Sequence, residues 1–184
     1  MPKTLIAVPH TGNIRAELAT FLLSLKSPDT KILLSYGRPI DHNRNQIVKT
    51  FLESDMDRLL MIDSDIEPPA NILEMEGDVC SALCHVPVGK EIFHTAIVKK
   101  DGGYERAKLE DGINEIDAIG TGCLMINRKV LEDIDKPTFR FRMTEEGLLE
   151  LGEDFDFCER AKEKGFKITC NTHFKCNHYQ IRNN

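Results

Sequence analysis

Two aspartates separated by one residue follow a short apolar run in the first half of the chain. Asp63 and Asp65 flank Ser64, directly after the apolar residues 59–62. In an extended backbone, side chains at positions i and i+2 point to the same side, so the two carboxylates can share a hard divalent cation. Asp-Ser-Asp also suits an ordinary solvated turn. The apolar run favours the metal-binding hypothesis, because ligands bind at the carboxyl ends of parallel strands.

A second acidic group lies in the stretch 152–157, where Glu153, Asp154 and Asp156 fall within four residues. A helix is predicted to start here, and acidic side chains cap helix N-termini and complement the helix dipole. Three acids exceed what one cap requires, and a carboxylate is also a suitable base for a hydroxyl proton. The sequence leaves both roles open. At a helix start, backbone amides are expected to lower the pKa of Asp154.

Further candidates come from a histidine, an arginine and a glycine-rich turn. His178 ends the last predicted strand and is a candidate imidazole ligand, with His173 as an equal alternative. The segment 120–122, Gly-Thr-Gly, is predicted to be a turn that lets the backbone approach a ligand closely. Arg44 is either an exposed helix cation or a donor of charge-assisted hydrogen bonds to a diphosphate.

Alternating strands and helices must position these residues. Apolar runs bounded by Gly or Pro indicate buried strands, and apolar residues at helical spacing indicate amphipathic helices, with Asn13 as a possible cap of the first. The alternation predicts an α/β fold with a mostly parallel central sheet, helices on both faces and a mixed second half. The predicted strands are 5–8, 31–36, 58–62, 78–86, 93–99, 116–119, 123–126, 139–143, 166–170 and 174–177, and the predicted helices are 13–26, 43–53, 128–134 and 154–164.

Length and composition are those of one globular domain. The chain has 184 residues, 24 basic and 30 acidic, with a formal net charge of -6. That sign makes nucleic acid an unexpected partner, so a bound phosphate must be held locally by a metal or a few groups. The sequence shows no signal peptide or transmembrane segment, which favours a cytoplasmic protein. Its six cysteines, without a C-x-x-C pair, are expected to be reduced and buried.

The order and spacing of these motifs resemble the nucleotide-sugar glycosyltransferases of the GT-A fold. The resemblance covers roughly residues 4–178 and is most specific at 63–65, 120–128 and 152–165. It implies a single Rossmann-like domain over 1–184, with a nucleotide-binding half at about 1–67 and a sugar and acceptor half at about 78–184. The chain is near-minimal for that family and lacks a C-terminal extension that often builds the acceptor site.

The resemblance also implies specific roles for the candidate residues. It implies a Mn²⁺ or Mg²⁺ ion on Asp63 and Asp65, completed by His178. The base of an inverting reaction maps to Asp154, with Glu153 as the fallback. The implied nucleotide- and donor-binding residues are Pro9, His10, Arg44, Asp63, Ser64, Asp65, Gly120, Thr121 and Gly122.

The predicted function is metal-dependent transfer of a sugar from a nucleoside-diphosphate donor, UDP- or GDP-linked, to an acceptor hydroxyl. The acceptor, whether glycan, protein or lipid-linked, is not indicated, nor is the stereochemical outcome. One alternative is a haloacid-dehalogenase-type phosphatase, which also carries D-x-D after an apolar strand. Its usual D-x-T continuation is absent, because Ile66 and Glu67 follow Asp65. A non-catalytic nucleotide-sugar-binding module is the other alternative.

Overall fold

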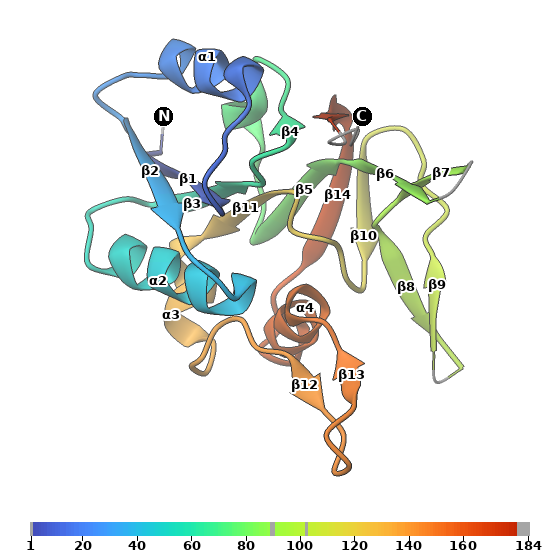
Figure 1. Cartoon of the computed structure of the whole chain (residues 1–184). Helices are drawn as coiled ribbons and strands as arrows, with labels where there is room; N and C mark the ends of the chain where they lie inside the picture. Colours follow the sequence, from blue (N-terminus) through green and yellow to red (C-terminus); the bar gives the residue numbers. More distant parts are fainter. Residues whose placement is uncertain (1, 89–90, 102, 180–184) are drawn as a thin grey trace.

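A seven-stranded sheet forms the centre of the computed structural model, which describes residues 2–88, 91–101 and 103–179 (Figure 1). Its strands, in spatial order, are β10 (Ile113–Ile116), β14 (Ile168–Lys175), β5 (Val79–Leu83), β11 (Cys123–Asn127), β3 (Arg58–Ile62), β1 (Thr4–His10) and β2 (Thr30–Tyr36). β10 and β11 run antiparallel to their neighbours, and the other five strands share one direction. The mostly parallel sheet that the sequence predicts is therefore confirmed.

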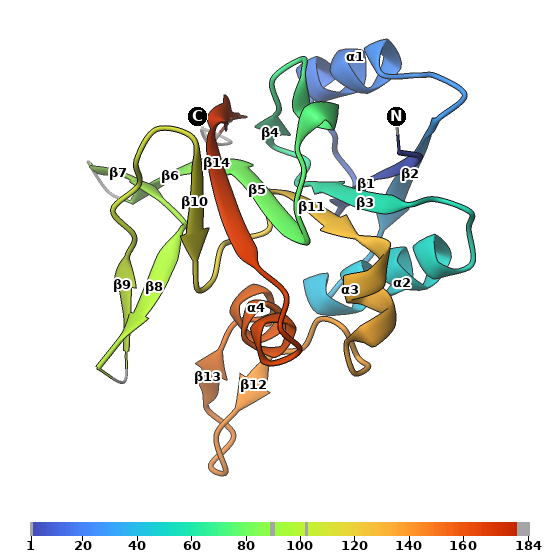
Figure 2. The ribbon, with the colours of Figure 1, turned by 180° about the vertical axis from the view of Figure 1, so that it is seen from behind.

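Helices cover both faces of this sheet (Figures 1 and 2). The helices are α1 (Ala16–Ser24), α2 (Ile40–Leu52), the 3-10 helix η1 (Ile72–Glu74), α3 (Arg128–Asp133) and α4 (Glu153–Glu163). One apolar cluster joins the sheet to α1 and η1, and a second joins the opposite face to α2, α3 and α4. Strands from both predicted halves lie in the same sheet, since β3 pairs with β11. No described helix has the length and apolar character needed to cross a membrane.

Four short strand pairs surround the sheet. They are β4 (Ile66–Glu67) with β15 (Asn177–His178), β6 (His85–Val88) with β7 (Glu91–His94), β8 (Ile97–Lys100) with β9 (Gly103–Arg106), and β12 (Arg142–Met143) with β13 (Leu149–Leu151). The pair β12–β13 forms a hairpin that projects from the body of the protein, and β8–β9 projects beside it (Figure 1). Most of these short strands, together with the antiparallel β10 and β11, lie in the second half, which is therefore mixed as the sequence predicts.

Several element boundaries differ from prediction because tertiary contacts decide them. α1 begins at Ala16, and its N-cap is Arg15 rather than Asn13. The strand predicted at 139–143 is reduced to β12, because Phe139 is fully buried and stacks on Phe157 at 4.8 Å. The cysteines follow prediction: all six are buried and free.

Candidate active site

Two adjoining cavities open at the carboxyl ends of β1 and β3. The α4 cavity, about 260 Å³, is lined by Ile40, Arg44, Asp63, Ile66, Cys84, Val86, Thr95, Gly120, Thr121, Gly122, Glu153, Asp154 and His178. The β1 cavity, about 240 Å³, is lined by Pro9, His10, Thr11, Gly37, Ile40, Asn43, Arg44, Asp63, Ser64 and Asp65. Every residue that the sequence and the family resemblance place in the site lines one of these cavities, apart from the alternative His173.

The position of Asp63 follows from the strand that precedes it. All five residues of β3 are buried, so the chain leaves the core only after Ile62. The Asp63 amide donates to the Gly122 carbonyl at 2.9 Å, and the Ile66 amide donates to the Asp63 carbonyl at 3.0 Å. These bonds fix the segment 63–65 as a tight turn held against the segment 120–122. The two motifs, about 55 residues apart in sequence, thereby meet.

Arg44 links the turn after β3 to the start of α4. Its guanidinium donates to a carboxylate oxygen of Glu153, and its Nη2 lies 3.1 Å from Oδ1 of Asp63. The residue is only 4% exposed, so the hypothesis of an exposed helix cation is wrong. Its Nε is buried and has no hydrogen-bond partner among the described residues. Arg44 lines both cavities, but its two terminal nitrogens are occupied by protein carboxylates.

Negative charge exceeds positive charge at this point of the structure. Arg44 pairs with Asp63 and Glu153 and acts on Asp154, while Asp65 acts on Asp63 from the same turn. Burial raises the pKa of Asp63, Arg44 opposes this shift, and the charges of Asp65 and Asp154 add to it. Four carboxylates and one guanidinium leave a local excess of negative charge. Such a site is stabilised by a bound divalent cation.

His178 faces Asp65 in a geometry that suits a metal ligand. Its Nδ1 lies 2.8 Å from the His85 carbonyl, and its Nε2 lies 3.1 Å from Oδ2 of Asp65. A carbonyl only accepts hydrogen bonds, so Nδ1 carries a proton. In the neutral ring, Nε2 then directs a lone pair at a carboxylate oxygen, and a proton or a cation must lie between them. A backbone acceptor on the second ring nitrogen is also the usual environment of a metal-binding histidine.

The donor set fits a borderline-hard divalent cation. A carboxylate oxygen and an imidazole nitrogen converge at Asp65 and His178, which suits Mn²⁺ better than Ca²⁺. Asp63 offers a second carboxylate from the same turn, but this carboxylate is hydrogen-bonded to Arg44. Across the described residues, no three His, Cys, Asp or Glu side chains are already arranged as a metal site. Full coordination would therefore require oxygen ligands from bound phosphate or water.

The acidic start of α4 does not act as an N-cap. The N-cap is Gly152, without a side-chain capping bond. Glu153 pairs with Arg44, and the buried Asp156 pairs with Arg160 at 2.7 Å. Asp154, in contrast, forms no salt bridge among the described residues.

The expected lowering of the Asp154 pKa is wrong. Burial and then the charge of Glu153 raise this pKa, although the Phe155 amide donates to Asp154 Oδ1 at 2.9 Å. The helix begins inside the protein, at the cavity wall, so loss of solvent outweighs the helix amides. A raised pKa makes Asp154 a stronger base than an exposed aspartate.

The β1 cavity offers hydrogen-bond donors. The Gly12 amide donates to Nδ1 of His10 at 3.2 Å, so the neutral His10 ring carries its proton on Nε2. The ring packs against Tyr36, with centroids 5.8 Å apart, at the paired ends of β1 and β2. Ser64 adds a hydroxyl to the same wall. This cavity therefore combines aromatic surface with neutral donors, beside the carboxylates.

Gly120 is required for a contact within the protein. A Cβ atom at Gly120 would lie 3.1 Å from Cβ of Thr95, whereas one at Gly122 would be 3.5 Å from the Cys84 sulfur, an ordinary contact. The close approach predicted for this turn is thus made at Gly120 by Thr95. Thr95, Cys84 and Val86 line the α4 cavity without having been predicted. They are ordinary strand and loop residues, which carry no chemical signal in the sequence.

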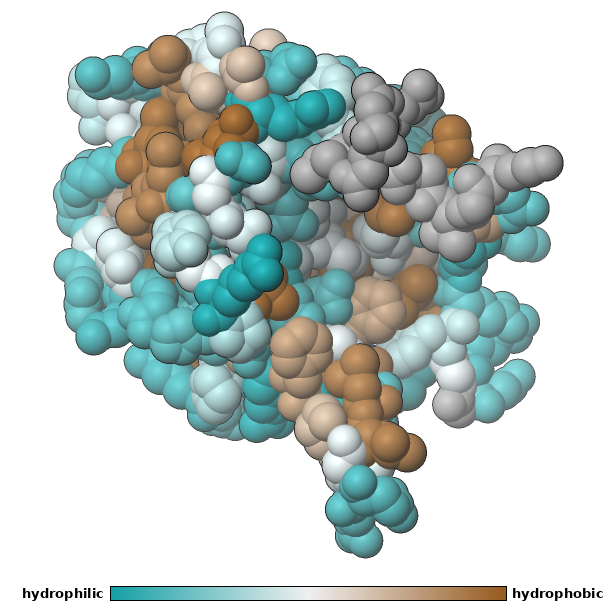
Figure 3. Space-filling model, in the orientation of Figure 1, coloured by the Kyte–Doolittle hydropathy of each residue, from teal (hydrophilic) through white to brown (hydrophobic). Residues whose placement is uncertain are grey.

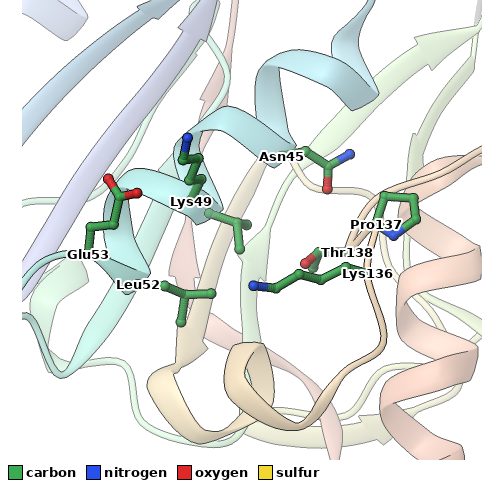
Figure 4. Close-up of a pocket in the computed structure, with 8 residues that line it drawn as sticks. Asn45, Lys49, Leu52, Glu53, Lys136, Pro137 and Thr138 are labelled. Atoms are coloured by element: carbon green, nitrogen blue, oxygen red, sulfur yellow. The ribbon is translucent and has the colours of Figure 1, made fainter.

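His173 does not belong to the site. It lies on β14 with a 63% exposed side chain, and its Nε2 is 3.4 Å from Asp111. Another cavity, about 440 Å³, lies between α2 and the segment 136–138 (Figure 4). Lys49 and Lys136 lie along its walls, and none of the predicted site residues lines it.

The β12–β13 hairpin carries exposed apolar surface. In the space-filling view, the face of Figure 1 is hollowed between the β12–β13 hairpin and strands β8 and β9 (Figure 3). Apolar surface gathers on the hairpin beside this hollow. The exposed apolar residues of the hairpin are Phe141, Met143, Leu148 and Leu149.

Similarity to known proteins is found at the level of structure. The sequence matches no protein-family model and no curated protein. The structure of A197 from STIV superposes with a TM-score of 0.71 at 24% identity, covering 97% of this chain and 86% of that one. GalNAc-T7, crystallised with UDP, GalNAc and Mn²⁺, gives 0.62 at 10% identity. This chain is covered to 98% in that match but spans only 44% of GalNAc-T7.

Nucleotidyltransferases share the same architecture. The inositol-1-phosphate CTP transferase from T. maritima superposes with a TM-score of 0.54 at 10% identity, covering 97% of this chain and 89% of that one. These identities are low, so the likeness establishes the fold. The sheet order, the helices on both faces and these superpositions agree: the chain has a GT-A-like fold.

Proposed function

We propose that the chain is a metal-dependent glycosyltransferase that moves a sugar from a nucleoside-diphosphate donor, UDP- or GDP-linked, to an acceptor hydroxyl with inversion. One observation carries the proposal. The turn after β3 and the start of α4 bring Asp63, Glu153 and Asp154 together near Arg44, and His178 faces Asp65 in the same turn. Two of the proposed ligands, Asp63 and His178, line the same cavity as the candidate base Asp154, and Asp65 lines the adjoining β1 cavity of this GT-A-like fold.

Asp65, His178 and Asp63 would hold the cation, Mn²⁺ in preference to Mg²⁺ because of the imidazole. The bound ion would offset negative charge on the departing diphosphate as a Lewis acid. Mn²⁺ in the GalNAc-T7 crystal structure supports this choice. Pro9, His10, Ser64 and the turn 120–122 would contact the donor, with the His10 Nε2 proton directed at an acceptor atom.

Asp154 is the residue best suited to take the proton of the acceptor hydroxyl. It lines the α4 cavity and makes no salt bridge among the described residues, whereas the Glu153 carboxylate is held by Arg44. Burial raises the pKa of Asp154 and so strengthens it as a base. Arg44 holds the Glu153 side chain in place, and the pair forms part of the cavity wall.

Calorimetry with UDP and with GDP, in EDTA and in Mn²⁺, tests the metal requirement. We expect tight binding of one nucleotide only with Mn²⁺, because the local charge of the site is negative. Asp65→Ala should abolish the Mn²⁺-dependent part of the nucleotide affinity while the domain stays folded. Glu74→Ala, which changes an exposed carboxylate on η1, is the matched control. Equal affinity in both buffers would remove the metal from the proposal.

Turnover separates this function from its alternatives. A glycosyltransferase slowly hydrolyses its donor or glycosylates an acceptor from a glycan, peptide or lipid-linked panel, and a binding module does neither. A nucleotidyltransferase would instead form a sugar nucleotide from a nucleoside triphosphate and a sugar phosphate. The phosphatase alternative predicts release of inorganic phosphate from a sugar phosphate, and the GT-A-like fold gives it no support.

A further inference from the structure

The last described residues of the chain, 177–179, lie beside β4, next to the turn that contains Asp65. Asn177 and His178 pair antiparallel with Glu67 and Ile66. The Tyr179 amide then donates to the Asp65 carbonyl at 2.8 Å. The pair β4–β15 has only two residues in each strand, and isolated pairs of this length are not stable by themselves. The preceding residue is held by the bond from the Cys176 amide to the Leu83 carbonyl at 3.0 Å, and side-chain contacts add to it along the pair.

Glu67 provides those contacts on both sides of His178. The Tyr179 hydroxyl donates to Glu67 Oε2, and the Asn177 side-chain amide donates to the same oxygen at 3.3 Å. Both donors therefore reach the same oxygen of Glu67. The Glu67 side chain is thus hydrogen-bonded to both residues adjacent to His178 in sequence.

Arg15 supports the same segment from the other side. Its guanidinium carbon lies 4.6 Å from the centroid of the Tyr179 ring, a cation–π contact, and its backbone amide lies 3.5 Å from the Ser64 carbonyl. Residues from the start of α1, the 63–65 turn and β4 therefore converge on Tyr179. Among the described residues, none of these contacts is made by His178 itself, whose ring nitrogens bond to His85 and Asp65.

We propose that Glu67 is a positioning residue for the metal site: through Tyr179 and Asn177 it sets the imidazole of His178 opposite Asp65. The inference rests on the proposed function, since it takes His178 and Asp65 as ligands. In this arrangement Oε2 of Glu67 accepts from Tyr179 and Asn177, and Glu67 acts on the site through these two residues. Its loss lets the terminal segment leave β4, and the ion loses its nitrogen ligand.

A double-mutant cycle on Mn²⁺ affinity tests the proposal, read by calorimetry or by electron paramagnetic resonance of free Mn²⁺. We expect Glu67→Ala to weaken Mn²⁺ binding by about 10- to 100-fold, the usual effect of removing a group that orients a ligand. In a His178→Ala background, the same change should alter affinity by less than about twofold. Tyr179→Phe, which removes one hydroxyl, should weaken Mn²⁺ binding by a smaller factor in the parent protein. In the His178→Ala background it should not change Mn²⁺ affinity.

The control and the contrary outcomes are distinct. Glu74→Ala should leave Mn²⁺ affinity unchanged, and thermal midpoints verify folding. Tyr179→Phe carries the test if Glu67→Ala does not fold. If Tyr179→Phe and Glu67→Ala both bind Mn²⁺ with the affinity of the parent, the positioning role of Glu67 is wrong, while the proposed metal site is unaffected. An equal loss with and without His178 overturns it too, because Glu67 would then act on the ion directly. If His178→Ala itself binds Mn²⁺ like the parent, the proposed metal site is wrong.

Discussion

Glu153 and Asp154 are adjacent in sequence, yet the fold gives them different partners. Glu153 is bonded to the buried Arg44, and Asp154 is left facing the cavity with a raised pKa. Desolvation is the larger cause of that shift, and the charge of Glu153 is the second. Two neighbouring acids can thereby take different roles, one in holding the site together and one in proton transfer.

Asp154→Asn should lower the transfer rate by about 10²-fold or more, the usual scale for loss of a general base. Binding of donor and Mn²⁺ should be retained, because the proposed ligands are other residues. Steady-state kinetics and calorimetry on the same preparation check both parts. Glu163→Gln, an exposed carboxylate at the end of α4, is the control. A fully active Asp154→Asn with an inactive Glu153→Gln would move the base to Glu153.

The pH dependence of kcat/KM should follow the raised pKa of Asp154. The base works only when deprotonated, so activity should fall as the pH drops through a pKa higher than that of an exposed aspartate. Glu153→Gln removes a negative charge that raises this pKa, and the Arg44 charge then acts on Asp154 with less compensation. Both changes should move the acid limb to lower pH. A limb that moves to higher pH in Glu153→Gln would contradict the assignment.

At the scale of elements, the site depends on how closely the turn 120–122 approaches the strands beside it. The Gly122 carbonyl accepts a hydrogen bond from the Asp63 amide, and Gly120 packs against Thr95. Two glycines in one turn therefore have different steric surroundings. The difference allows a paired test in which the same methyl group is added two residues apart.

Gly120→Ala should displace Thr95 or the turn, because the added Cβ would lie 3.1 Å from Thr95. We expect a loss of about 1–3 kcal/mol of unfolding free energy, as for overpacked sites, together with weaker nucleotide binding. Gly122→Ala should cost less, since its Cβ would make only ordinary contacts, with Cys84 at 3.5 Å and Ile66 at 3.7 Å. Urea unfolding and nucleotide titrations compare the two variants. Equal effects would show that steric contact with Thr95 does not control this turn.

At the scale of the whole molecule, the protein and its proposed donor carry charge of the same sign. The net charge is -6, and a nucleoside diphosphate is also an anion. Long-range attraction therefore cannot concentrate the donor at the site. The carboxylates of the site repel the diphosphate further, unless a divalent cation is bound between protein and phosphate. Cation and nucleotide are accordingly expected to bind together.

Thermal unfolding should report this coupling. Mn²⁺ plus the correct nucleoside diphosphate, at about 100 times the dissociation constant, should raise the midpoint by about 5–10 °C for a chain of this size. Nucleotide in EDTA should give little change, and Mn²⁺ alone a smaller shift than the pair. In Asp65→Ala the joint shift should disappear. A full shift with nucleotide alone would contradict the coupling.

The sequence by itself determined the general architecture and the candidate residues of the site. Apolar runs and helical spacing are local patterns that indicate buried elements, so β3 at 58–62 is predicted to the residue. Asp63, Asp65 and Asp154 are candidates because carboxylates after a buried strand or at a helix start can bind a cation or accept a proton, although turns and helix starts also use them structurally. Their roles remain proposals, although the structure places them at one pair of cavities.

Only the tertiary structure decided which partners these residues have. It separated His178 from His173, gave Glu153 to Arg44, raised the pKa of Asp154 and revealed Glu67 beneath the terminal segment. Each of these outcomes depends on groups far apart in sequence, such as Arg44 and Glu153, and on how much water the packed chain excludes. Hydrogen-bond partners and desolvation are properties of the packed chain, so spacing along the sequence does not encode them directly.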